Sequence, residues 1–225
     1  MGASALLAVY PPNRLTAQIG YPPEHSPYRD VKRGRSLIFG GGYLTGSRGV
    51  VNVGPSDGPT ATARFEVSFG KPLAFYLETT YARLSRYIAD PSQNQEDHFS
   101  GPVQSNVGMV MGGAHLNITG PKTWHHFAPY IGGAGGVVFA DDPPADSSGY
   151  KFSAKAIVGP EVGLRLYLGR RLAVRTEMRW MFWQLKYPST FKQPSPDDSR
   201  VLPLDAEDDE WTSHPWLTVM VAWTL

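Results

Sequence analysis

The residues of this sequence whose types and spacing could do chemistry are charged side chains at alternate positions inside otherwise apolar stretches. The clearest case is Arg175, Glu177 and Arg179, which alternate with apolar residues. Successive side chains of a β-strand point to opposite faces, so residues two apart share a face. By this rule one face gathers five cations and four anions: Arg64, Glu66, Glu78, Lys155, Glu161, Arg165, Arg175, Glu177 and Arg179. These charges could line an ion conduit or form a gate. They could also pair with each other and fill a barrel, which we favour because eight strands leave room only for side chains.

The opposite face of the same stretches is apolar. Beside the charges of residues 172–182 it presents Leu172, Val174, Thr176, Met178, Trp180 and Phe182. A soluble ligand-binding barrel of the lipocalin kind, our alternative, would place apolar residues inside and charges outside. A continuous apolar face opposite concentrated charges instead favours lipid outside and a salt-bridged lumen.

The stretches that must position these residues are short and regularly punctuated. Eight of them predict strands: residues 35–46, 61–70, 73–84, 105–120, 128–140, 152–169, 172–187 and 211–225. Short connections at residues 71–72, 121–127 and 170–171 alternate with long ones at residues 47–60, 85–104, 141–151 and 188–210. Alternating tight turns and long loops are typical of a bacterial outer-membrane barrel, with turns in the periplasm and loops outside the cell. An even number of strands then places both termini in the periplasm.

Composition removes several classes of function. The chain has no cysteine, which excludes disulfides, thiolate metal sites and cysteine nucleophiles. No apolar run approaches the length of a spanning helix. Residues 1–34 contain Pro11-Pro12, Pro22-Pro23 and Pro27, which predict an extended N-terminal periplasmic tail or the remnant of a signal peptide. Residues 35–225 form the predicted barrel domain.

One segment and its successors resemble a known family. Pro129-Tyr130-Ile131-Gly132-Gly133-Ala134-Gly135-Gly136-Val137 is similar to the glycine-rich strand of small OmpA-like and OmpX-like outer-membrane barrels. As in that family, it is followed by residues 162–168, a tight turn and residues 172–180. The resemblance covers residues 35–225 and implies an all-β, eight-stranded antiparallel up-and-down transmembrane barrel. The chain departs from the family at its end, where Leu225 replaces the usual phenylalanine.

The sequence gives little support for a catalytic or metal-binding site. A resemblance to lipid A deacylases would imply a His and a Ser two apart near the end of residues 172–187, but residues 180–187 contain neither. We therefore predict no enzyme, and a lipid A-modifying hydrolase remains an alternative. Adjacent His125 and His126 would point apart and make a poor metal site, and His115 fits a hydrogen-bonded lumen residue. We predict no metal and no cofactor.

The long loops carry most of the negative charge. Their formal charges sum to about −10, against about +11 for the rest of the chain. The simpler interpretation is solvated loops that resist aggregation. The alternative is a cation-bridged contact with lipopolysaccharide phosphates or with a basic partner. The predicted partners are outer-membrane lipid, lipopolysaccharide and other envelope proteins, with no nucleic acid and no small-molecule substrate.

Overall fold

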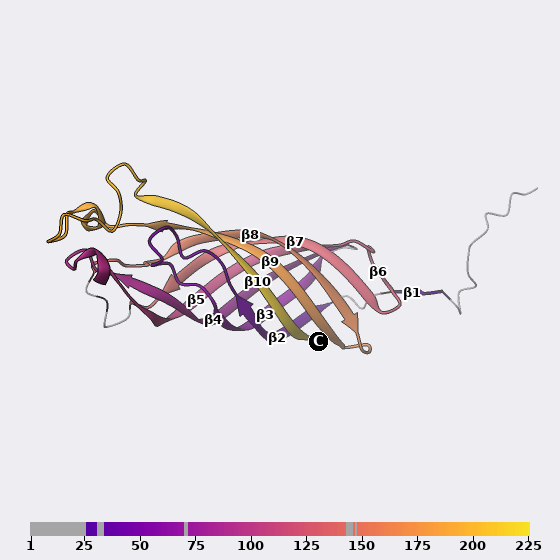
Figure 1. Cartoon of the computed structure of the whole chain (residues 1–225). Helices are drawn as coiled ribbons and strands as arrows, with labels where there is room; N and C mark the ends of the chain where they lie inside the picture. Colours follow the sequence, from indigo (N-terminus) through magenta and orange to yellow (C-terminus); the bar gives the residue numbers. More distant parts are fainter. Residues whose placement is uncertain (1–25, 31–33, 70–71, 143–145, 147) are drawn as a thin grey trace, which may run out of the picture.

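The computed structural model describes residues 26–30, 34–69, 72–142, 146 and 148–225, and within them eight long strands close into one barrel (Figure 1). These are β2 (Arg35–Leu44), β3 (Gly58–Phe69), β4 (Leu73–Ala89), β5 (Phe99–Asn117), β7 (Phe127–Ala140), β8 (Lys155–Tyr167), β9 (Leu172–Lys186) and β10 (Asp209–Thr224). Each strand pairs antiparallel with its neighbours along this series, and β10 pairs with β2 from Trp216↔Leu44 to Thr224↔Ser36. The predicted up-and-down barrel is confirmed.

Two short strands extend the sheet at one end of the barrel. Inside the predicted tight connection 121–127, β6 (Lys122–Trp124) pairs antiparallel with β1 (Tyr28–Asp30). A two-residue turn follows β6, with φ values of 47° at His125 and 69° at His126. Within the predicted tail of residues 1–34, the structure thus places an ordered strand, while residues 1–25 and 31–33 lie outside the described part.

Several strands continue further than their alternation predicted. β4 runs on to Ala89 and β5 already begins at Phe99, because the two strands keep pairing beyond a register shift between Arg86 and Ile88. The segment between them includes the 3-10 helix η2 (Gln95–Asp97), and η3 (Ser189–Lys192) lies between β9 and β10. No helix in the described part of the chain is long and apolar enough to cross a membrane.

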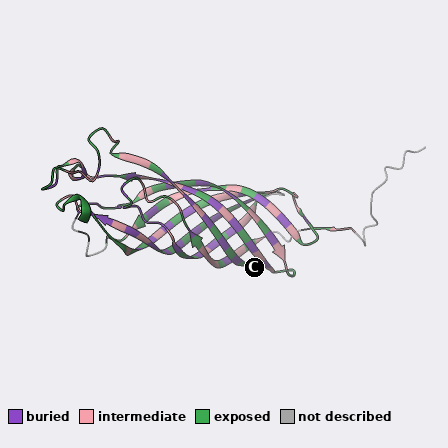
Figure 2. Ribbon diagram, in the orientation of Figure 1, coloured by how far each residue is buried: buried purple, intermediate pink, exposed green. Residues whose placement is uncertain are grey.

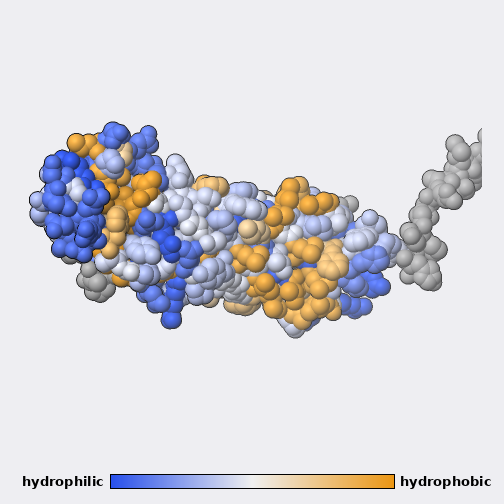
Figure 3. All heavy atoms as spheres, in the orientation of Figure 1, coloured by the Kyte–Doolittle hydropathy of each residue, from blue (hydrophilic) through white to orange (hydrophobic). Residues whose placement is uncertain are grey.

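The two faces of the sheet differ as the alternation predicted, and burial switches from residue to residue along the strands (Figure 2). Outward apolar side chains are exposed, including Phe39 at 60%, Leu77 at 62% and Val219 at 53%. In the view of Figure 3 such residues gather towards the end of the barrel that carries β1 and the C-terminus, whereas the loop end is mostly hydrophilic. The outward face therefore forms an apolar belt suited to lipid.

The interior is filled in three layers. Near the C-terminal end lies an apolar cluster of Ile38, Ala173, Met220 and Ala222. The charged residues occupy the middle. Towards the loops a larger apolar cluster begins with Met109, Met111, Trp183 and Trp216 and continues into loop residues such as Val53, Phe152 and Phe191.

Candidate functional site: the charged lumen

Eight of the nine predicted lumen charges lie in the middle layer and are buried. Their exposed fractions do not exceed 3% for Arg64, Glu66, Glu78, Glu161, Arg165, Arg175, Glu177 and Arg179. Lys155 shares their face but is the first residue of β8, half-buried, with its Nζ 5.3 Å from the centre of the Phe152 ring. Among the described residues no ion pair includes Lys155, so it stands apart from the other eight.

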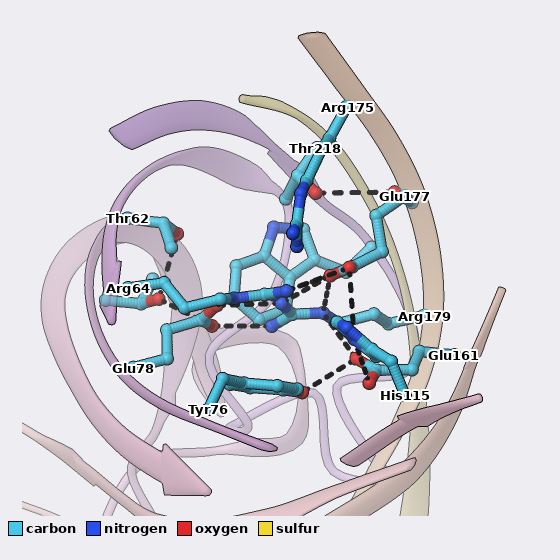
Figure 4. Close-up of polar contacts among 12 residues, drawn as sticks. Thr62, Arg64, Tyr76, Glu78, His115, Glu161, Arg175, Glu177, Arg179 and Thr218 are labelled. Carbon is cyan, nitrogen blue, oxygen red and sulfur yellow. Dashed lines mark hydrogen bonds and ion pairs between the residues drawn. The ribbon is translucent and has the colours of Figure 1, made fainter. Parts of the chain in front are cut away.

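Two arginines and two glutamates form a closed ring across the lumen (Figure 4). Arg64 donates from Nε to Glu78 Oε2 at 2.7 Å and from Nη2 to Glu177 Oε1 at 2.7 Å. Arg179 donates two parallel hydrogen bonds to Glu78, at 2.6 and 2.8 Å, and a third from Nε to Glu177 Oε1 at 2.6 Å. Each guanidinium thus bridges both carboxylates. Charge-assisted and two-pronged contacts of this kind are the strongest hydrogen bonds in proteins.

A second group lies around Glu66. Arg175 donates to both oxygens of this carboxylate, at 2.7 and 2.5 Å, and Arg165 donates to it at 3.3 Å. His115 joins the two groups, because its Nδ1 lies 3.2 Å from Glu66 Oε2 and its Nε2 lies 3.6 Å from Glu177 Oε2. Its Nε2 also lies 2.6 Å from Glu161 Oε1, and Glu161 Oε2 lies 3.4 Å from Arg179 Nε. All these side chains therefore form one network.

Two tyrosines complete the network. Tyr76 donates from Oη to Glu161 Oε2 at 2.8 Å, and Tyr130 donates to Glu177 Oε2 at 2.6 Å. Their rings flank His115, with centroid distances of 4.8 and 4.4 Å. Tyr76 shares the charged face because it lies two residues before Glu78 in β4, whereas no role in the lumen was predicted from the sequence for Tyr130 of the glycine-rich strand.

The tyrosine rings need cross-strand glycines. Tyr76 pairs with Gly113, and Tyr130 pairs with Gly163. A Cβ atom at either glycine would lie 2.3 Å from the ring of the facing tyrosine. The pattern that could have identified Tyr130 is a tyrosine paired with a glycine of the neighbouring strand. Finding this pattern requires the register between the two strands, which the alternation within one strand does not give.

The chemistry of the network is that of mutual neutralisation. Its four arginines and four glutamates balance in formal charge. Burying one such charge alone would cost several kcal/mol, so pairing is the cheap arrangement. Ligand atoms of His115, Glu161 and Glu177 lie within 4.8 Å of one another, close enough for a metal ion. However, Glu177 already accepts hydrogen bonds from two arginines and Tyr130, and a dication would leave excess positive charge. The donor set therefore fits a salt-bridged core better than a metal site.

The fold and the buried network define the class of protein: an eight-stranded membrane-type β-barrel with a filled lumen. No protein-family model matches the sequence. No curated protein matches it either.

Comparison with solved structures finds the same architecture in outer-membrane proteins. Neisserial surface protein A aligns with a TM-score of 0.54 and 12% identity, covering 85% of this chain and 97% of that one. The outer membrane protein OprG from Pseudomonas aeruginosa aligns with a TM-score of 0.51 and 13% identity, covering 87% and 98%. The chain thus has the fold of the small outer-membrane β-barrels, as the resemblance implied.

Proposed function

We propose that this protein is a non-enzymatic barrel of the bacterial outer membrane that displays a rigid acidic surface outside the cell. The observation that carries the proposal is the filled lumen, in which apolar layers lie on both sides of the paired charges. Eight strands leave an interior just wide enough for side chains, so this filling argues against a conduit. With both termini in the periplasm, the four long loops lie outside the cell.

The loops support this role because they fold together as a cap. Val51, Phe152, Phe191 and Leu202 come from three different loops and are all buried in one apolar cluster. Polar contacts add to this packing. Arg86 and Asp146 form a buried ion pair at 2.6 Å. The backbone amide of Gln95 donates to Asp197 at 2.8 Å, which joins the second and fourth loops. A packed cap holds its outer surface in one shape, which lowers the entropic cost of binding a partner.

The outer surface of this cap is acidic. Its exposed acidic residues are Glu96, Asp97, Asp141, Asp142, Asp197, Asp198, Asp205, Glu207 and Asp208. Such a surface suits a basic partner, or lipopolysaccharide phosphates bridged by divalent cations. Other envelope proteins with basic surfaces are further candidate partners.

Planar-bilayer recording tests the closed lumen. The refolded protein is expected to give no steady conductance, while an open porin in the same bilayer provides the positive control. A stable open channel would refute the plug. The absence of enzymatic activity is tested separately by incubating the folded protein with lipopolysaccharide, and released acyl chains would overturn it.

A further inference from the structure

The outward face of β3 and β4 is hollowed within the apolar belt. Two hollows, of about 290 and 430 Å³, share Ala63 and Thr79 in their linings. We call the two together the β3–β4 groove. It lies on the face opposite the charged lumen, because Ala63 and Thr79 alternate with the buried residues Arg64 and Glu78.

The strand register explains the groove. Small residues occupy adjacent outward positions, because Ala63 pairs with Thr79 and Ala61 lies two residues before Ala63. Tyr81 stands beside them, between Ala61 and Gly108 of β5. Larger outward side chains stand around them. These walls are Phe39, Phe65, Leu77 and Phe139, each at least 40% exposed. The groove is thus an open surface hollow with apolar walls and a floor of small side chains.

A positively charged side chain, that of Arg83, lies at the loop end of the groove. Arg83 follows Tyr81 by two positions on the same face of β4 and donates from Nε to Tyr81 Oη at 3.4 Å. Tyr81 in turn donates to Asn106. Arg83 forms no ion pair with any described residue, so its guanidinium remains available to an anion.

The length of the groove matches one leaflet of a bilayer. Arg83 and Leu77 are six residues apart in β4, which is about 20 Å along a strand. With the usual strand tilt this corresponds to about 15 Å along the membrane normal. A bilayer core is about 30 Å thick, so each leaflet contributes about 15 Å. A lipid headgroup bound at Arg83 would therefore place its acyl chain along the groove through the thickness of one leaflet.

We propose that the β3–β4 groove is a specific lipid site, which seats one acyl chain of an anionic, phosphate-bearing membrane lipid while Arg83 binds its phosphate. The apolar walls contact the chain and the guanidinium neutralises the headgroup. This site depends on the barrel lying in a bilayer and takes its lipid from the leaflet at the loop end, but it does not depend on what the cap binds. Its failure and that of the proposed function are therefore separate results.

Native mass spectrometry of the refolded protein, released from detergent micelles, tests the site. Phosphatidylglycerol is titrated against phosphatidylcholine with the same chains, since only the first has net negative charge. The parent is expected to retain one phosphatidylglycerol at lower lipid concentration. Arg83→Gln should weaken this retention about fivefold, since a basic residue near an anionic surface contributes about 1 kcal/mol. Its effect on phosphatidylcholine should be smaller, because the choline group already neutralises that phosphate.

Ala63→Phe fills the groove and should abolish retention of both lipids. If this variant does not show the heat-modifiable gel migration of a folded barrel, Ala63→Leu replaces it. The matched controls lie on the outward face of β9, where Lys186→Gln removes a cation near the loops and Thr176→Phe adds a ring. Both should behave as the parent.

Three results would overturn the proposal. The first is equal retention of lipid by the parent and the Ala63 variants. The second is equal weakening by Arg83→Gln and Lys186→Gln, which would show general surface attraction. The third is a parent dimer that Ala63→Phe dissociates, which would make a second copy of the chain the occupant.

Discussion

Arg64 of β3 and Glu177 of β9 meet across the lumen at 2.7 Å, although two other strands separate β3 from β9 in the sheet. Neither backbone pairing nor sequence proximity brings them together, since they are 113 positions apart. Their contact exists only in the closed barrel, so it ties the charged core to closure.

The first prediction is that Glu177→Ala destabilises the barrel by about 3–5 kcal/mol, because it leaves buried arginine charge without its partner. Unfolding by urea in lipid vesicles measures the change. Thr176→Ala, one position away on the outward face, is the control. A loss below about 1 kcal/mol would show that water already screens the core.

The second prediction concerns the space for Tyr130. Gly163→Ala places a Cβ where the tyrosine ring lies and should destabilise the protein by about 1–3 kcal/mol, as overpacking of a core does. Gly169→Ala is the control, because no atom lies within 4 Å of its added Cβ. Equal stabilities of the two variants in the same urea titration would contradict the cross-strand packing.

Alternation of side chains predicted the eight long strands approximately and put on one face the eight charges that lie buried in the lumen. It placed Arg175, Glu177 and Arg179 on one face because a strand has a two-residue period whatever its neighbours are. It could not give the partners of each charge, which depend on register and on contacts across the lumen. Neither the continuation of β4 to Ala89 nor the strand Tyr28–Asp30 was predicted, because both are stabilised by pairing with distant segments.

The third prediction tests the apolar belt. Val219→Arg places a charge in the belt and should cost about 2–4 kcal/mol, whereas a charge near the interface costs about 0–1 kcal/mol. Trp211→Arg, on the same face of β10 but close to the loops, is the matched variant. Folding yields in vesicles and urea midpoints compare the two. If Val219→Arg is no worse than Trp211→Arg, the belt does not face lipid.

The fourth prediction concerns the link between the second and fourth loops. Hydrogen bonds from the Gln95 amide and from Ser199 lower the pKa of Asp197 to about 2. A lowered pKa means that the link is fully present above the ordinary value, near 4, and is lost as the pH falls through about 2. Hydrogen exchange at the Gln95 amide should therefore show protection at pH 3. Asp197→Ala should remove it at every pH, and the same protection in that variant would exclude Asp197 as its cause.

The last prediction concerns orientation. If the loops face outward, trypsin added to intact cells reaches Arg200, a partly exposed arginine of the fourth loop whose acidic partner, Asp198, lies 3.9 Å away. The turn at Arg170, at the opposite end of the barrel, should be cut only after the outer membrane is permeabilised. The packing of the cap should make cleavage slow, because proteases need a segment that opens locally. Mass spectrometry of the fragments identifies the sites, and Arg200→Gln should remove the first one. Cleavage at Arg170 on intact cells, with Arg200 protected until permeabilisation, would reverse the orientation while leaving the barrel itself unaffected.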